Sequence, residues 1–286
     1  MGSSEIRSQL LGNTSHYERL LSIEARRLTR KYPDPELARQ FAKISMGFVS
    51  IAPMALCKAA LADMDLKAPD RLLVALALIN VHISTHDDVV DETPETKSGI
   101  AAMLYAGNIT LIEGMQMLVN EGYENVLDAA MEKVKVNHLM QRRVIDYLWK
   151  EEMPTRAEYL KGIRHIISWA SIGVYAALEY AGRTADYGKR MGVFCENYGL
   201  SIQFMDDMRE MEEDSQHGYW SLPIIRARTH NLDISSMEVK NELAVDLKAM
   251  IFRNTDRAAS ALPTNWDAMR SMVTRLYDYA SKFSYE

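Results

Sequence analysis

The sequence predicts an all-α protein, and two observations carry that prediction. Residues that break helices are scarce, with 14 Gly and 8 Pro among 286 residues. In almost every long segment the apolar residues recur with a period near 3.6 rather than in alternation, which indicates helices with one buried face. Because no long Ser/Gly/Pro linker and no repeat divides the chain, we expect residues 1–286 to form a single helical domain.

Short stretches rich in turn-forming residues should separate the helices. In chain order they fall at 31–36, 64–70, 92–99, 151–158, 216–223 and 260–266. Within the fourth stretch, Thr155 followed by Glu158 is typical of a capping box that opens the next helix.

Composition excludes several classes of function. The 33 Lys and Arg residues against 39 Asp and Glu residues give a net charge of -6, which argues against nucleic acid or an anionic membrane as the main partner. The two cysteines, Cys57 and Cys195, support neither a disulfide framework nor a thiolate zinc site. No apolar run approaches the ~20 residues needed to span a bilayer, and the first residues lack the apolar core of a signal peptide. We expect a cytoplasmic protein without stable membrane insertion.

An apolar helical segment over 71–84 is followed by THDDVVDE at 85–92. Asp87 and Asp91 are four residues apart and share one helix face, with Asp88 turned about 100° to the side. Thr93 precedes a proline, so the helix should end near it and leave the acids in its last turn.

Acids in that position are disfavoured. The helix dipole costs each about 0.3–1 kcal/mol, and two carboxylates 4 Å apart repel by about 4 kcal/mol at an effective dielectric constant of 20. A bound divalent cation would offset this, and oxygen ligands favour Mg²⁺. The alternative is a solvated acidic helix end with no ligand.

A second acidic cluster, GLSIQFMDDMREMEED at 199–214, weakens that alternative. Asp206, Glu210 and Asp214 follow one another on one helix face, Asp207 lies beside them, and Gly218 should end the helix. Two acidic faces at the mouth of an apolar bundle could share Mg²⁺ ions that hold a diphosphate, above an apolar cavity that takes a hydrophobic tail.

At this point the residues resemble the trans-isoprenyl diphosphate synthase and class I terpene synthase superfamily. The first motif of that superfamily, DDxxD, matches Asp87, Asp88 and Asp91. The second, QxxDD, matches Gln203, Asp206 and Asp207, followed by Glu210. The resemblance implies metal ligands from both motifs, namely Asp87, Asp88, Asp91, Asp206, Asp207 and Glu210. Under the terpene cyclase pattern the ligands would include Asp214. The resemblance implies a helical bundle with a central apolar cavity, about three Mg²⁺ ions, a prenyl diphosphate substrate and, as is usual in the superfamily, a homodimer.

The departures from the family pattern concern the second substrate, isopentenyl diphosphate. Of the family's basic residues near the N-terminus and after the first motif, only Lys43 and Lys97 have counterparts here. The family's Lys-Thr pair is replaced by residues 166–167, both isoleucine, and the lysine of GKxTLP by Tyr219. Each lost charge-assisted hydrogen bond is worth roughly 1.5–3 kcal/mol, so chain elongation should be impaired.

The resemblance also suggests substrate contacts. Arg164 is the first candidate for the diphosphate, against the alternative of a surface arginine, and Lys97, Arg142 and Arg143 are further candidates. Residues that could line the cavity, or simply pack in the core, are Ile83, Asn80, His82, Gln203 and Trp169.

The leading interpretation is therefore a Mg²⁺-dependent class I terpene synthase that ionises a linear C15 or C20 allylic diphosphate and converts the cation to a cyclic or linear terpene. The alternatives are a prenyltransferase, either chain-elongating or acting on another acceptor, and a regulatory subunit of a prenyl synthase.

Overall fold

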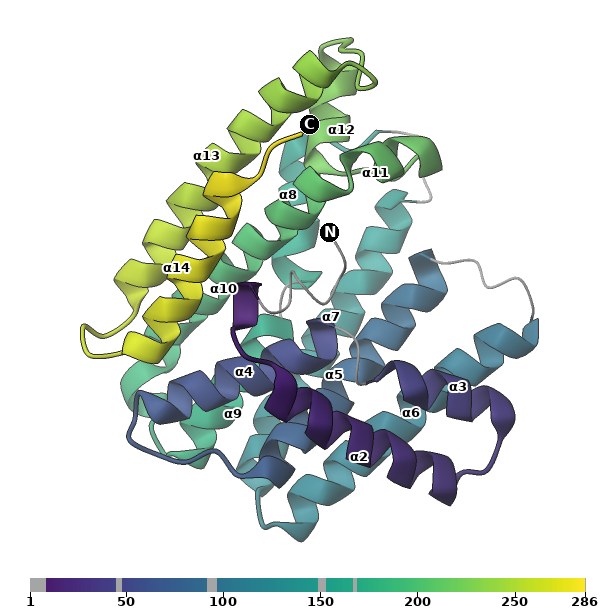
Figure 1. The fold of residues 1–286 in the computed structure, drawn as a ribbon, viewed down its shortest axis with the longest axis vertical. Coiled ribbons are helices and arrows are strands. Elements are labelled where there is room, and N and C mark those ends of the chain that lie inside the picture. Colours follow the sequence, from purple (N-terminus) through teal and green to yellow (C-terminus); the bar gives the residue numbers. More distant parts are fainter. Residues whose placement is uncertain (1–8, 45–47, 92–96, 149–152, 167–168, 286) are drawn as a thin grey trace.

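The computed structural model describes residues 9–44, 48–91, 97–148, 153–166 and 169–285. Within these ranges every regular element is a helix (Figure 1), which confirms the predicted all-α class. The helices are α2 (Ser15–Lys31), α3 (Pro35–Lys43), α4 (Phe48–Ala62), α5 (Asp70–Asp91), α6 (Lys97–Asn120), α7 (Glu124–Leu148), α8 (Arg156–Ile166), α9 (Trp169–Tyr180), α10 (Thr184–Arg209), α11 (Met211–His217), α12 (Leu222–Thr229), α13 (Met237–Ala261) and α14 (Asp267–Lys282).

Helices α5 and α10 are the two central helices. Helix α5 packs against α2, α4, α6, α7 and α9, and α10 packs against α8, α9, α12, α13 and α14. The stretch from Leu72 to Asn80 is buried on all sides, because a helix that is apolar all round must be enclosed by others. Helix α9 contacts both central helices, and Figure 1 shows their C-terminal ends rising toward the same end of the molecule. The fold thus brings the two predicted acidic helix ends to one side.

The predicted breaks are confirmed by the helix bounds. Helix α5 ends at Asp91, before the predicted stop. The capping box that opens α8 forms in both directions, with the Thr155 amide donating to Glu158 Oε2 at 2.8 Å and the Glu158 amide donating to Thr155 Oγ1 at 3.2 Å. Gly218 ends α11 with a φ of 75°, a left-handed conformation that favours glycine. No helix in the described ranges is both long and apolar enough to cross a membrane.

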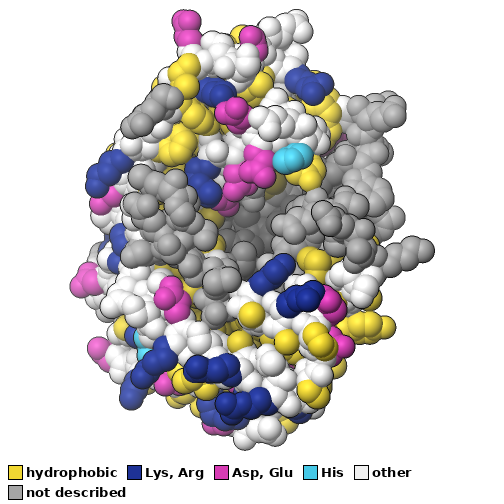
Figure 2. Space-filling model, turned by 45° about the vertical axis from the view of Figure 1, so that its right-hand side comes forward, with side chains coloured by type: hydrophobic (Ala, Val, Ile, Leu, Met, Phe, Trp, Pro, Cys, Tyr) yellow, Lys and Arg dark blue, Asp and Glu magenta, His cyan; other side chains and the backbone are white. Residues whose placement is uncertain are grey.

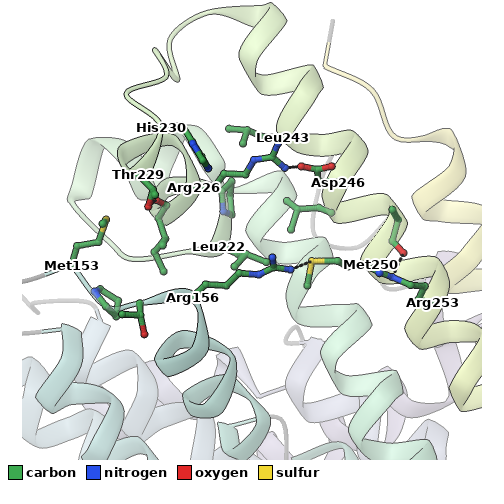
Figure 3. A pocket seen from close by; sticks show the side chains of 16 residues that line it. Met153, Arg156, Leu222, Arg226, Thr229, His230, Leu243, Asp246, Met250 and Arg253 are labelled. Atoms are coloured by element: carbon green, nitrogen blue, oxygen red, sulfur yellow. Dashed lines mark hydrogen bonds and ion pairs between the residues drawn. The ribbon is translucent and has the colours of Figure 1, made fainter.

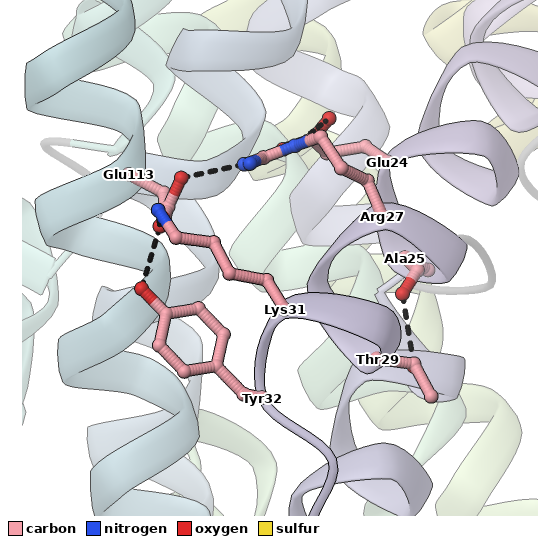
Figure 4. A network of polar contacts seen from close by, with 7 residues as sticks. All are labelled: Glu24, Ala25, Arg27, Thr29, Lys31, Tyr32 and Glu113. Carbon is pink, nitrogen blue, oxygen red and sulfur yellow. Dashed lines mark hydrogen bonds and ion pairs between the residues drawn. The ribbon is translucent and has the colours of Figure 1, made fainter.

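A buried carboxylate joins α2 to α6 (Figure 4). Glu113 of α6 has only 5% of its side chain exposed, and it accepts hydrogen bonds from Arg27 Nη2 and Lys31 Nζ, both at 2.5 Å, and from the Tyr32 hydroxyl at 2.6 Å. Arg27 also bonds Glu24. Burial alone would raise the pKa of Glu113, but the three donors outweigh it and lower this pKa to about 2. Glu113 is therefore held in its charged form.

Replacing Glu113 with glutamine should lower the free energy of unfolding by about 2 kcal/mol at pH 7, allowing for solvent around the half-exposed cations. The folded-state pKa is depressed, so this stability is present above the ordinary carboxyl pKa and is lost as the pH falls toward 2. Urea unfolding of the wild type and of Glu113→Gln at pH 7 and pH 3 measures the effect. Glu36→Gln, which removes an exposed ion pair with Arg39, is the control. A difference between wild type and Glu113→Gln that does not narrow at pH 3 would contradict this account.

Candidate active site

The first acidic motif lies in the last turn of α5, as predicted from its sequence. For several predicted site residues the structure describes at most the backbone and not the side chain, so their roles stay predictions. These residues are Asp87, Asp88, Asp91, Lys97, Arg142, Arg143 and Trp169.

The second acidic motif spans the junction between α10 and α11. Helix α10 ends at Arg209, Glu210 has a φ of −97° and a ψ of 8°, and α11 begins at Met211. The Glu210 amide still donates to the Asp206 carbonyl at 2.9 Å, and the Asp214 amide to the Glu210 carbonyl at 2.8 Å. The three acids therefore keep their one-turn spacing, although the single continuous helix expected over 199–214 is interrupted at Glu210.

Asp207 is buried and its carboxylate is bonded on several sides. The Tyr159 hydroxyl lies 2.8 Å from both carboxylate oxygens, Gln203 Nε2 donates at 3.0 Å and the Leu222 amide at 3.2 Å. The first of these donors comes from α8 and the last from the start of α12. Asp207 thus ties three helices together, and Gln203, expected to line the cavity, contributes to this network.

Asp206 lies about 100° around the helix from Asp207 and has a different environment. Arg209 Nη1 lies 3.1 Å from Asp206 Oδ1, and Arg209 Nη2 lies 3.6 Å from Glu210 Oε1. The side chains of Asp206 and Glu210 are 42% and 46% exposed. In Figure 2, acidic side chains gather at the rim of a hollow in one face of the molecule.

The carboxyl groups of this cluster have raised pKa values, because their surroundings disfavour the charged form. Partial burial raises the pKa of Asp206 to about 7, and the charge of Glu210 adds to the effect while Arg209 opposes it. Burial also raises the pKa of Asp207 to about 6, against the hydrogen bonds that it accepts, and it raises the pKa of Glu210 and Asp214. Groups perturbed in this way are candidates for a functional site.

An oxygen-liganded divalent cation fits this donor set. Asp206 and Glu210 offer carboxylate oxygens one turn apart, and a cation would favour the charged forms that burial disfavours. Among the residues that the structure describes, no three His, Cys, Asp or Glu side chains are placed to hold a metal ion together. Further ligands would have to come from the first motif or from water.

The structure does not bring Arg164 to the second motif. Its Nε lies 3.3 Å from Glu196 Oε1, in an ion pair in which both side chains are about half-exposed. Glu196 precedes Asp206 by nearly three turns of α10, about 15 Å along the axis. Arg164 therefore has the geometry of a surface arginine, which was the alternative given above. Arg209, which was not predicted from the sequence, contacts Asp206 and Glu210, and its position three residues after Asp206 could have indicated it.

The residues expected to line the cavity from α5 are buried. Asn80, His82 and Ile83 are 0%, 6% and 1% exposed. His82 Nε2 lies 2.9 Å from His138 Nε2 of α7, and burial followed by the charges of His86 and His138 lowers the pKa of His82 to about 4. His82 is therefore a neutral, buried histidine that links α5 to α7. This environment is that of the alternative given above, a residue that packs in the core.

Tyr285, near the end of the chain, was also missed. Its hydroxyl donates to the Met208 carbonyl, so the C-terminal segment closes onto the helix that carries the second motif. Burial, followed by the charges of Asp214 and Glu212, raises the pKa of Tyr285 to about 12. No local pattern in the sequence signals a contact between residues so far apart.

The fold is that of the trans-prenyl diphosphate synthases, which are helical bundles. This chain can be superposed on their structures over nearly its whole length. Three similar solved structures are a decaprenyl diphosphate synthase from Rhodobacter capsulatus (16% identity, 98% of this chain and 99% of that chain covered, TM-score 0.73), a geranylgeranyl pyrophosphate synthase from Lactobacillus brevis (16%, 95% and 99%, 0.71) and a geranyltranstransferase from Thermotoga maritima (12%, 93% and 98%, 0.72). At these identities the likeness establishes the fold. No protein-family model matches the sequence, and no curated protein does.

Proposed function

We propose that this protein is an enzyme that binds an allylic prenyl diphosphate at the acidic ends of α5 and α10 and breaks its carbon–oxygen bond to release diphosphate. The observation that carries the proposal is the Asp206 and Glu210 pair, whose carboxyl pKa values are raised at the end of a buried helix. The similarity to prenyl diphosphate synthases supports it.

In this proposal Asp206 and Glu210 hold the diphosphate through divalent cations, and Arg209 adds a cationic contact once the acids are neutralised. Bound Mg²⁺ would stabilise the negative charge that develops on the departing diphosphate. Asp207 acts differently: its hydrogen bonds from Tyr159 and the Leu222 amide hold the end of α10 in one rotation. That rotation turns Asp206 away from the core and toward the substrate side.

For the fate of the allylic cation, we propose prenyl transfer to an acceptor. Two of the solved structures described above are prenyl diphosphate synthases by name and the third is a geranyltranstransferase, and this supports transfer over cyclisation.

A terpene synthase is the second candidate, in which the cation reacts with its own double bonds. One observation favours it: the basic residues that hold isopentenyl diphosphate in the family are replaced here, with Tyr219 at the lysine position of GKxTLP and isoleucine at 166 and 167.

Product analysis distinguishes the two fates. Purified protein with Mg²⁺ is incubated with C10, C15 and C20 allylic diphosphates, each with and without isopentenyl diphosphate, and the organic extract and the diphosphate fraction are analysed. Longer prenyl diphosphates that form only with isopentenyl diphosphate are the expected result.

A terpene hydrocarbon or alcohol formed without isopentenyl diphosphate would instead establish the second candidate. Diphosphate release in neither condition, from protein shown to be folded by circular dichroism, would overturn the proposed function.

A further inference from the structure

A cavity that Asp206 and Glu210 do not line lies between the first turn of α8, helix α12 and helix α13 (Figure 3). Its volume is ≈ 850 Å³, within the range of about 300–1,000 Å³ common for small-molecule sites. Asp206, Asp207 and Glu210 do not line it. The cavity is therefore distinct from the acidic cluster, although it borders Leu222, whose amide bonds Asp207.

Its lining combines an apolar wall with arginines. Leu222 from α12 and Leu243 and Leu247 from α13 supply buried aliphatic surface. Arg156, Arg226 and Arg253 come from three different segments, α8, α12 and α13. Hydrophobic side chains with a few convergent polar groups are the usual composition of a ligand site.

The three arginines differ in their partners. Arg226 pairs with Glu242 at 3.3 Å and with Asp246. Arg156 instead contacts the Met250 sulfur at 3.7 Å, and Arg253 Nε donates to the Ala249 carbonyl at 3.2 Å. Within the described residues neither Arg156 nor Arg253 has a carboxylate partner, and in Figure 3 Met250 lies between them.

We propose that this cavity binds an anionic amphiphile with a phosphate-type head group and a short apolar tail. Arg156 and Arg253 recognise the head group, because a guanidinium matches phosphate oxygens with paired N–H donors. The tail lies along Leu222, Leu243 and Leu247, where its burial is favourable. This proposal concerns binding and does not rest on the proposed function.

Calorimetric titration of the full chain with decyl phosphate, below its critical micelle concentration, tests it. EDTA is present so that no divalent cation can bridge the probe to the acidic motifs. We expect one bound molecule per chain and an affinity at least tenfold weaker in the double variant Arg156→Ala/Arg253→Ala. Arg257→Ala, which removes an exposed arginine of the same helix α13 that does not line the cavity, should leave the affinity unchanged.

A second variant tests whether the ligand occupies the cavity, without changing any charge. Ala249 is exposed and lines the cavity, so Ala249→Trp should keep the fold and obstruct the cavity with an indole ring. Weaker binding of decyl phosphate to this variant supports the site.

Other probes show whether the ligand is a membrane lipid or a soluble molecule, and whether binding needs both the phosphate and the apolar tail. Sedimentation with phosphatidylcholine vesicles containing phosphatidic acid, lost in the double variant, would identify a membrane lipid as the source, whereas binding of decyl phosphate alone would identify a soluble amphiphile. Equal binding of decanol or of inorganic phosphate would overturn the proposal, and so would the absence of binding or undiminished binding to the double variant.

Discussion

Asp206→Asn is expected to reduce diphosphate release from an allylic prenyl diphosphate by about 10³-fold, which corresponds to about 4 kcal/mol of transition-state stabilisation. The substitution keeps the shape of the side chain and removes the charge that would hold a cation. It should not destabilise the fold, because the raised pKa of Asp206 means that the folded protein disfavours that charge in the absence of metal. Diphosphate release and urea unfolding, measured on the same preparation, test both statements.

Glu213→Gln is the matched control for Asp206→Asn. Glu213 is an exposed acid of α11 beside the same cluster, so its loss lowers the local negative charge without removing an expected ligand, and turnover should stay within about twofold. Full activity in Asp206→Asn would move the reaction away from this motif. A similar loss in both variants would show that the overall negative charge matters rather than one carboxylate.

Gly173→Ala is expected to lower the free energy of unfolding by about 3 kcal/mol and the melting temperature by roughly 5–10 °C. Helix α9 crosses α4 at Gly173, where an added Cβ would lie 2.2 Å from the Pro53 carbonyl oxygen and 2.9 Å from its carbonyl carbon. These are backbone atoms of a helix, so no rotamer change can relieve the contact. Differential scanning calorimetry of the wild type and the variant measures the loss.

Gly188→Ala separates this close approach from the general effect of removing glycine. Gly188 lies inside α10, and its added Cβ would meet Thr184 Cγ2 at an ordinary 3.4 Å. Since alanine is preferred over glycine in a helix by up to about 1 kcal/mol, this variant should be neutral or more stable. A melting temperature for Gly173→Ala that matches that of Gly188→Ala would contradict the account of the α4 and α9 contact.

Features encoded in neighbouring residues could be predicted from the sequence. The apolar run over 71–84 predicted α5, Thr155 and Glu158 predicted the start of α8, and Gly218 predicted the end of α11. Each depends on residues within one or two turns, where helix geometry fixes the relation between side chains.

Contacts between distant segments could not be predicted in this way. The pairing of Arg164 with Glu196 and of His82 with His138 depends on which helices become neighbours. The break at Glu210 was also missed, since no proline or glycine marks it. A helical pattern specifies a face, but the partner of that face is decided by the packing of the whole bundle.

Asp206 and Asp207 are adjacent and chemically identical, yet Asp206 is partly exposed and pairs with Arg209, whereas Asp207 is buried and holds α8, α10 and α12 together. Their tolerance to mutation should therefore differ over evolutionary time. If Asp206 carries the proposed chemistry, a change there would alter the reaction and leave the bundle folded, whereas a change at Asp207 would disturb the packing of three helices as well. Evolutionary change should therefore be less constrained at Asp206 than at its neighbour Asp207.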